Sequence, residues 1–284
     1  MPLSDHEAAA RSAHGALWMS ARLRTAIAGL VLLSGAAAAS ATDLRCKGPG
    51  NVEDFRYTWR LRGGLSWVAG FMFPTSGVGM LKTTYPKPGE QNVVSGELLI
   101  TPASGGANGF YVYETQIDPM GKTLMTYHGY AWGKKSRKER TLFDYAKHLA
   151  RIRKETPDKT EDRVKPLPPE EMRDILTAIH YLRQNAPNIN RPITTVIYSD
   201  GNEYPVIFRP IEHRQFAIAQ QKVDALGFEI VDGPGGKKWP GGIRVWVSND
   251  ARRIPFRIEI RQSMASLQLD LQSVEACAFM GSGS

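Results

Sequence analysis

The chain has 284 residues, of which 42% are hydrophobic and 23% charged, a composition that excludes an intrinsically disordered protein. Its 36 lysines and arginines exceed its 28 aspartates and glutamates, so the net charge is +8. A length of this order is enough for one sizeable domain or two small ones.

The N-terminal segment has the organisation of a secretory signal peptide. Arg22 and Arg24 precede an uncharged run over residues 25–35, and small residues follow at 39–41. This is the order of a basic region, an apolar region and an A-x-A cleavage site. The sequence therefore predicts a signal peptide over residues 1–41, with Met19 as an alternative start. The apolar run is shorter than a membrane span of about 20 residues.

Export defines the expected compartment and narrows the partners. Without residues 1–41, the totals fall to 33 basic and 26 acidic residues, a net charge of +7. We expect a periplasmic protein with no transmembrane span in the mature chain, and export separates it from nucleic acid. Cys46 lies near the cleavage site, but Asp43, Leu44 and Arg45 are not the small and apolar residues that a lipoprotein site requires. We expect no lipid anchor.

Cys46 and Cys277 are the two cysteines of the chain, and they enclose almost all of the mature sequence. In an oxidising compartment, an even number of cysteines without metal-ligand spacing favours a disulfide. Two unrelated buried thiols are the alternative. A disulfide between them would make the first and last strands neighbours in one closed unit.

Most of the chain has strand patterns. Residues 55–61 alternate between apolar and polar, 65–73 are more continuously apolar, and further strands are expected at 93–101, 110–115 and 123–130. The segment 76–79 is interpreted as a turn. The last third returns to strands, with Asp200-Gly201 as a hairpin turn. This part is expected to form strands at 193–199, 203–210, 222–231, 243–247, 254–261 and 266–274.

The middle of the chain interrupts the strand pattern. Pro168 and Pro169 are suited to the first turn of a helix, and apolar residues follow at helical spacing until Asn185. These apolar positions are Met172, Ile175, Leu176, Ile179 and Leu182. We therefore expect a single β domain over 42–280, a basic helical insertion over about 134–186, and a flexible tail at 281–284.

Two segments resemble a known family. They are Asp174-Ile-Leu-Thr-Ala-Ile-His-Tyr-Leu-Arg and Val245-Trp-Val-Ser-Asn-Asp-Ala-Arg-Arg-Ile-Pro-Phe-Arg. Together with Tyr57 and Trp59, they resemble the bacterial envelope family catalogued as domain of unknown function 3108. The resemblance implies a secreted, mainly β protein with a central helix, built on a strongly curved antiparallel sheet or open barrel that looks like periplasmic lipoprotein carriers. The second segment also has a structural interpretation, because Asn249-Asp250 suits a tight turn and Pro255 a strand start.

No catalytic motif is found. The histidines have no metal-ligand spacing, no HExxH or CxxC is present, and no Gly-x-Ser-x-Gly occurs. We therefore expect no enzymatic activity, no metal and no cofactor. The aromatic residues of the first half suit the core of a β domain, or one face of the sheet that lines an apolar pocket for a lipid. The candidates for such a lining are Leu65, Trp67, Phe71, Phe73, Ile175 and Ile179.

The segment 134–154 has nine basic residues against Glu139 and Asp144. It is either a solvated charged face or a contact with anionic lipid or acidic glycan, and its apolar positions allow a basic amphipathic helix. The candidates for contact with an anionic surface are Lys134, Lys135, Arg137, Lys138, Arg140, Lys147, Arg151, Arg153 and Lys154.

The sequence thus predicts an exported envelope protein that binds an amphipathic or lipid-like ligand or a membrane component. A scaffold that binds another envelope protein through a sheet edge is the alternative. The shape of the concave face separates the two, because an open cavity favours a carrier and a filled one favours a scaffold.

Overall fold

A computed structural model describes residues 49–278, apart from 64–73, 88, 91–92, 104–109, 119–120, 133, 168–170, 187–190, 200, 219–220, 240 and 262–265. The predicted signal peptide, Cys46 and the predicted tail lie outside these residues, as do four lining candidates, Leu65, Trp67, Phe71 and Phe73. The described residues belong to one compact unit, Ala39–Ser284.

The described part of the chain is mainly β and contains one helix, α2 (Ile175–Asn185). The strands of the first half are β1 (Pro49–Gly50), β2 (Val52–Arg62), β3 (Ser76–Thr84), β4 (Val94–Pro102), β5 (Phe110–Ile117), β6 (Thr123–Trp132), β7 (Lys135–Asp144), β8 (Leu149–Thr156) and β9 (Lys159–Pro166). The strands of the second half are β10 (Met172–Arg173), β11 (Ile193–Ser199), β12 (Asn202–Ile218), β13 (Gln221–Asp232), β14 (Gly242–Ser248), β15 (Pro255–Arg261) and β16 (Ser266–Ala278).

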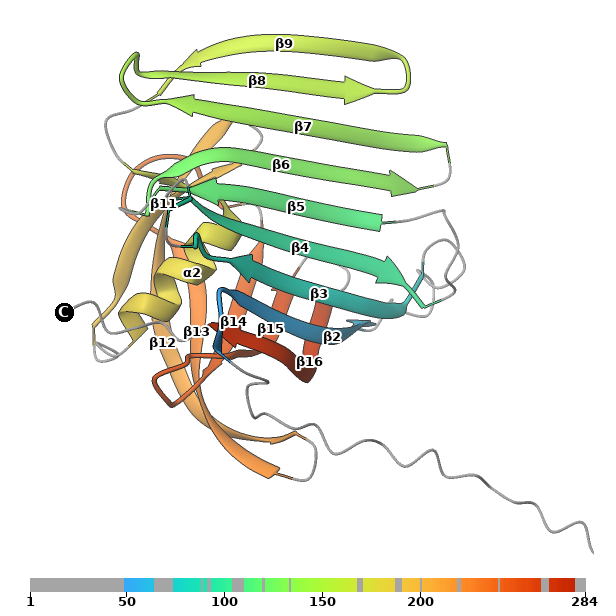
Figure 1. The fold of residues 1–284 in the computed structure, drawn as a ribbon, viewed down its shortest axis with the longest axis vertical. Coiled ribbons are helices and arrows are strands. Elements are labelled where there is room, and N and C mark those ends of the chain that lie inside the picture. The colour runs from blue at the N-terminus through green and yellow to red at the C-terminus, as the bar shows by residue number, and fades with distance from the viewer. Residues whose placement is uncertain are drawn as a thin grey trace, which may run out of the picture. The chain divides into compact units, whose positions relative to one another are not determined.

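These strands form a single sheet that consists of two meanders (Figure 1). One runs from β2 to β9 and the other from β11 to β16, and each strand pairs with its neighbour in the chain. The antiparallel ladder between β16 and β2 joins the two meanders. Parallel pairing occurs at β10–β11 and at β1–β16. The expected mainly β, antiparallel class is therefore confirmed.

Helix α2 connects β10 to β11, two parallel neighbours, and parallel strands require such a crossover. Asp174 is its N-cap, because the Asp174 side chain accepts from the backbone N–H of Thr177 at 2.7 Å. The prediction that the helix begins at Pro168-Pro169 is wrong, since Met172–Arg173 is strand β10. Asp174, six residues after Pro168, is the N-cap, so the first turn of the helix starts there.

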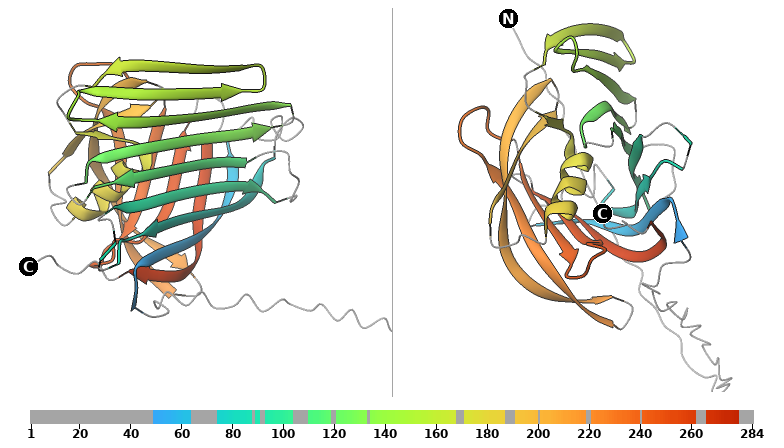
Figure 2. Two further views of the ribbon diagram at one scale, coloured as in Figure 1. Left: turned by 45° about the horizontal axis from the view of Figure 1, so that its top comes forward. Right: turned by 60° about the vertical axis from the view of Figure 1, so that its left-hand side comes forward.

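The apolar patterns of strand and helix meet in one core. On β2, Phe55, Tyr57 and Trp59 are buried while the residues between them are exposed. On α2, the predicted stripe is buried at Leu176 and Leu182, and both belong to the same hydrophobic cluster as the β2 residues. Figure 2 shows α2 between the two halves of the sheet. The sheet therefore uses one face to bury the helix.

The predicted basic helix over the first part of 134–186 is wrong, because the segment 135–166 forms strands β7, β8 and β9. Buried residues alternate with exposed ones at Glu139, Thr141 and Phe143, and again at Ala150 and Ile152. A period of two is a strand pattern. The apolar positions of this segment also fit helical spacing, and pairing with β6 decides between the two periods.

The two ends of the sheet contact each other without a described ladder between them. The Phe143 ring on β7 lies edge-on to the Tyr198 ring on β11, with centroids 5.2 Å apart. Lys165 Nζ on β9 donates to the carbonyl of Gly201 at 2.7 Å. The sheet is thus not closed by hydrogen-bonded strands, and side chains connect its ends.

Candidate functional site

The sheet face that covers α2 is filled. Ile179 is 3% exposed and Ile175 is partly buried, and both pack in the main core. Beside the helix remains a cavity of about 30 Å³, lined by residues such as Leu81, Thr115 and His180. This space holds about one water molecule. The two lining candidates on the helix are therefore core residues, and the described cavity beside the helix is too small for an acyl chain.

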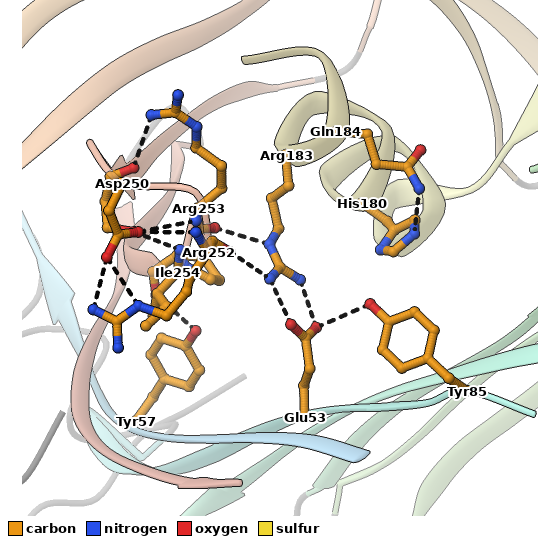
Figure 3. Close-up of polar contacts among 12 residues, drawn as sticks. Glu53, Tyr57, Tyr85, His180, Arg183, Gln184, Asp250, Arg252, Arg253 and Ile254 are labelled. Atoms are coloured by element: carbon orange, nitrogen blue, oxygen red, sulfur yellow. Dashed lines mark hydrogen bonds and ion pairs between the residues drawn. The ribbon is translucent and has the colours of Figure 1, made fainter. Parts of the chain in front are cut away.

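A buried ion pair ties α2 to the sheet (Figure 3). Arg183 Nη1 and Nη2 each donate to a carboxylate oxygen of Glu53 at 2.8 Å, and the two side chains are only 2% and 3% exposed. Tyr85 Oη donates to the same carboxylate at 3.3 Å. Burial alone would lower the pKa of Arg183, but the hydrogen bonds and charge of Glu53 raise it. Arg183 therefore stays charged.

The same guanidinium also binds the turn between β14 and β15. Arg183 Nε donates to the carbonyl of Arg253 at 2.8 Å, and Nη2 donates to the carbonyl of Arg252 at 3.0 Å. Arg253 has a φ of 48°, so this turn contains a left-handed residue. Asp250 stabilises the turn by accepting from Ser248 Oγ at 2.6 Å and from the N–H of Arg252 at 3.1 Å.

The two sequence segments that resemble a family therefore meet at Arg183. The first segment supplies the arginine at its end, and the second supplies the turn whose carbonyls receive it. Tyr57 Oη adds a hydrogen bond of 2.7 Å to the carbonyl of Pro255 in the second segment. We call Glu53, Arg183 and the turn 250–253 the polar clasp. Its contacts account for both segments as structural elements.

His180 lies on α2 beside the polar clasp, with its ring centroid 6.2 Å from that of Tyr85. Burial, followed by the nearby charge of Arg183, lowers the pKa of His180 to about 4, while the charge of Glu53 opposes this effect. Gln184 lies 3.0 Å from His180 Nε2. The imidazole is therefore neutral at pH 7.

A second, larger hollow lies away from the helix. It measures about 590 Å³, and its described walls come from β2, β3, β12, β15 and β16 with Ala103 beyond β4. Beyond the irregular register at Pro210/His213, β12 pairs with β13 alone, and this ribbon supplies Phe216 and Ile218 as one wall. We call this space the ribbon hollow. Its volume is within the range of about 300–1,000 Å³ that is usual for ligand pockets.

The ribbon hollow has a charged row. Trp246, Arg257, Asp270 and Thr58 are successive cross-strand partners, so their side chains share one face of the sheet. Thr58 alternates with the buried Tyr57, so Thr58, Asp270 and Arg257 lie on the face opposite to Tyr57, while Trp246 at the end of the row is buried in the core. Asp270 accepts from Arg257 Nε at 2.6 Å. It also accepts from Arg60 Nη2 at 3.1 Å and from Gln268 Nε2 at 2.5 Å.

Apolar and aromatic groups complete the walls. Phe216 lies 6.4 Å from Phe256 between ring centroids, and the guanidinium carbon of Arg257 lies 4.8 Å from the Phe216 centroid. Trp59 Nε1 donates to the carbonyl of Thr101 at 2.8 Å. The indole crosses β3 at Gly77, where a Cβ would come within 2.5 Å of Nε1 and 1.9 Å of the Thr101 oxygen. The hollow thus joins apolar walls to arginine side chains.

The structure does not bring the nine predicted anionic-surface residues to one face. Register places Lys138, Arg140, Arg151 and Arg153 on one side of the sheet, and Lys135, Arg137 and Lys154 on the other. Lys134 and Lys147 lie in turns. Arg153 Nε donates to Glu155 and Arg137 Nη2 to Glu139, so part of the positive charge is paired. The nine candidates therefore do not lie on one common face of the sheet.

The predicted disulfide lies only partly within the described residues. The backbone of Cys277 is described but its side chain is not. Pro49, three residues after Cys46 in the sequence, pairs with Cys277 in the parallel β1–β16 ladder. Over the described residues, no group of three or more His, Cys, Asp or Glu side chains could hold a metal ion. No helix in that part is long and apolar enough to cross a membrane.

The fold and the polar clasp define a mainly β protein whose open antiparallel sheet carries helix α2. A family model described as "Protein of unknown function (DUF3108)" matches residues 87–272. The match covers more than half of the chain, so the chain belongs to this family, which confirms the resemblance stated from the sequence. The matched range includes Arg183 and the turn 250–253 of the polar clasp, whereas Glu53 lies before it.

A search of curated proteins finds no match. Among solved structures, a β-barrel-like protein of domain of unknown function DUF1849 from Brucella abortus is similar at 8% sequence identity and a TM-score of 0.49. The similarity covers 80% of this chain and 98% of that one.

Proposed function

We propose that the protein is an exported, non-catalytic periplasmic protein that binds an amphipathic, lipid-like ligand in the ribbon hollow. The observation that supports this proposal is the combination of about 590 Å³ of space with apolar walls and arginine side chains. Ligand pockets are typically apolar with a few polar groups that orient the ligand. Phe216, Ile218 and Phe256 are the apolar part here, and Arg60 and Arg257 are the polar part.

The binding site of this proposal differs from that of a carrier with an open concave face. Core side chains pack on the face of the sheet toward α2, and the cavity that the described residues line beside the helix is about 30 Å³. The curved sheet of lipoprotein carriers, which shelters acyl chains on its concave side, is thus an analogy for the architecture alone. In our proposal, the ligand binds where the β12–β13 ribbon lies beside β15, β16, β2 and β3.

The alternative function, a scaffold that adds a strand at a sheet edge, has less support. The edge strand β9 carries Lys159, Glu161, Asp162 and Arg163 and ends at Pro166. Charged side chains and proline on an edge strand prevent pairing with another chain. Val164 is 62% exposed on this strand but has charged neighbours on both sides. We therefore favour the ligand-binding function.

The proposal also includes the disulfide between Cys46 and Cys277. The parallel pairing of Pro49 with Cys277 supports it, because three residues span at most about 11 Å. This disulfide would fix the start of the mature chain to strand β16, which lines the ribbon hollow through Asp270, Leu271 and Gln272.

The test uses two probes with the same twelve-carbon chain, laurate and dodecyl maltoside, below their micelle concentrations. Ala217 is exposed and lines the hollow, so Ala217→Trp adds a bulky side chain at its wall without replacing a core residue. Gln215 lies two residues earlier on the same face of β12 and outside the lining, so Gln215→Trp is the matched control. Calorimetric titration should show binding of at least one probe to the wild type and to Gln215→Trp, and a loss in Ala217→Trp.

Two results would count against the proposal. If the delipidated full chain binds neither probe, the proposal that it binds a lipid-like ligand is contradicted. Equal binding by Ala217→Trp and the wild type would place the ligand outside the ribbon hollow.

A further inference from the structure

We infer that the head group of the ligand is an anion, a carboxylate or a phosphate on an apolar chain, and that Arg257 binds it with Arg60. This inference rests on the proposed function, since it assigns the chemistry of a ligand in the same ribbon hollow. The juxtaposition that carries it is two guanidinium groups that share one carboxylate at the edge of an apolar space.

The charges of the hollow favour an anion. Arg60 and Arg257 contribute two positive charges, and Asp270 is the only acidic residue among the described lining residues. A third cation, Arg214, lies with its guanidinium carbon 5.3 Å from the Phe216 centroid. The described lining thus has two guanidinium groups against one carboxylate, with Arg214 nearby on Phe216, and its net charge is positive.

The geometry of Arg257 leaves part of its hydrogen-bonding capacity for a ligand. Asp270 accepts from Nε, and no hydrogen bond from Nη1 or Nη2 of Arg257 is found among the described residues. The side chain is 17% exposed and lines the hollow. A guanidinium with two available N–H groups binds a carboxylate or phosphate in a bidentate manner.

Phe216 holds the guanidinium in place. The Arg257 guanidinium carbon lies 4.8 Å from the Phe216 ring centroid, within the range of a cation–π interaction. Phe216 also lies 6.2 Å from Trp246 between centroids, in an edge-on arrangement. An anion on Arg257 would therefore place its apolar chain next to Phe216, where Phe256 and Ile218 continue the wall.

Asp270 competes with the ligand for the two arginines. Its carboxylate accepts from both, and Gln268 Nε2 donates to it as well. Removal of this charge would leave two guanidinium groups for the ligand, so the affinity for an anion should increase. Removal of Arg257 should have the opposite effect, and these two opposite changes test the assignment.

The experiment measures dissociation constants by calorimetry for four probes with one chain length: laurate, dodecyl phosphate, dodecyl maltoside and dodecyltrimethylammonium. The full chain should bind laurate or dodecyl phosphate at least tenfold more tightly than the neutral maltoside, and the ammonium probe most weakly. The ratio of laurate to dodecyl phosphate then separates a fatty-acid-like ligand from a phospholipid-like one.

Three variants complete the test. Arg257→Gln should weaken the binding of the anionic probes about tenfold, which corresponds to about 1.4 kcal/mol, and leave the binding of dodecyl maltoside unchanged. Asp270→Asn should increase the affinity for the anionic probes. Arg209→Gln is the control, because Arg209 is an exposed arginine of β12 that pairs with Glu229 outside the hollow.

The outcomes separate this inference from the proposed function. Equal affinity for the anionic and neutral probes, with binding lost in Ala217→Trp, would overturn the anionic head group and retain the lipid-like ligand. Stronger binding of anions that Arg257→Gln and Asp270→Asn leave unchanged would overturn the role of Arg257. Absence of binding by all four probes would overturn both.

Discussion

Arg183 of helix α2 and Glu53 of strand β2 are 130 residues apart in the chain, and two hydrogen bonds of 2.8 Å join them in the interior. The same guanidinium binds the carbonyls of Arg252 and Arg253, so three distant segments share one side chain. An ionised group in the interior needs such a complete set of partners, because an unpaired one is strongly destabilising.

We therefore predict that Glu53→Gln lowers the free energy of unfolding by about 3–5 kcal/mol, since it leaves the buried charge of Arg183 without its counter-ion. Urea denaturation measures this change. The double variant Glu53→Leu/Arg183→Leu should lose less than the sum of the two single variants. Glu155→Gln removes the exposed partner of Arg153 and should change stability by less than about 1 kcal/mol. A similar small loss for Glu53→Gln would contradict the role of the polar clasp.

Gly77 and Gly79 form a matched pair on β3. A Cβ at Gly77 would lie 1.9 Å from the Thr101 oxygen, whereas the nearest atom to a Cβ at Gly79 is 3.3 Å away in a Leu269 side chain. Gly77→Ala should therefore displace the Trp59 indole and destabilise the fold by about 1–3 kcal/mol, while Gly79→Ala should cost less. Thermal unfolding gives the stability, and tryptophan fluorescence reports the change at Trp59. Equal effects of the two substitutions would show that Trp59 does not need Gly77.

From the lowered pKa of His180 we predict that the protein loses stability in acid. Burial, followed by the charge of Arg183, lowers the pKa of His180 to about 4 in the folded state, below its usual value of about 6.5. The contribution of neutral His180 to the free energy of unfolding is complete above pH 6.5. It is lost as the pH falls toward 4, because the unfolded chain then binds a proton that the folded chain does not. The loss is at most about 3 kcal/mol.

The difference between urea midpoints at pH 7 and pH 4 measures this effect. His180→Gln should reduce the difference, and His213→Gln, at an exposed position of β12, should leave it unchanged. An acid loss of the same size in His180→Gln and the wild type would assign the pH dependence to other groups.

The disulfide between Cys46 and Cys277 gives a prediction on the mature, exported protein. Peptide mapping without reductant should yield one linked peptide that contains both cysteines. Reduction should lower the unfolding free energy by up to about 5 kcal/mol, because the bond closes a very long loop. Cys46→Ser should reproduce this loss and should be insensitive to reductant. Alkylation of both thiols in the native, unreduced protein would contradict the bond.

The parts of the fold that follow from local periodicity could be predicted from the sequence. The alternation at Phe55, Tyr57 and Trp59 defines a half-buried strand, and the spacing of Leu176, Ile179 and Leu182 defines a helix face. The segment 134–154 could not be assigned in this way, because its apolar residues fit both periods. Pairing with a neighbouring strand decides between strand and helix for such a segment, and β7 pairs with β6.

The candidate site could be predicted only in part. The resemblance includes Tyr57 and Trp59. The sequence predicts a turn at Gly77, but Gly77 is a strand residue on which the Trp59 indole lies. The ribbon hollow takes its walls from segments up to about 200 residues apart, and no spacing in the sequence connects them. The resemblance did identify the two segments of the polar clasp, although not the contact between them.

The order of the strands has a consequence for folding kinetics. Within each meander, neighbouring strands are also neighbours in the chain, so these ladders close short loops and should form early. The β16–β2 ladder instead joins residues such as Arg60 and Asp270, which are 210 residues apart. We therefore expect the joint between the halves to form last, and with it both the polar clasp and the ribbon hollow. A circular permutant that begins near β10 and links β16 to β1 would make every antiparallel ladder local, and it should fold faster than the natural chain.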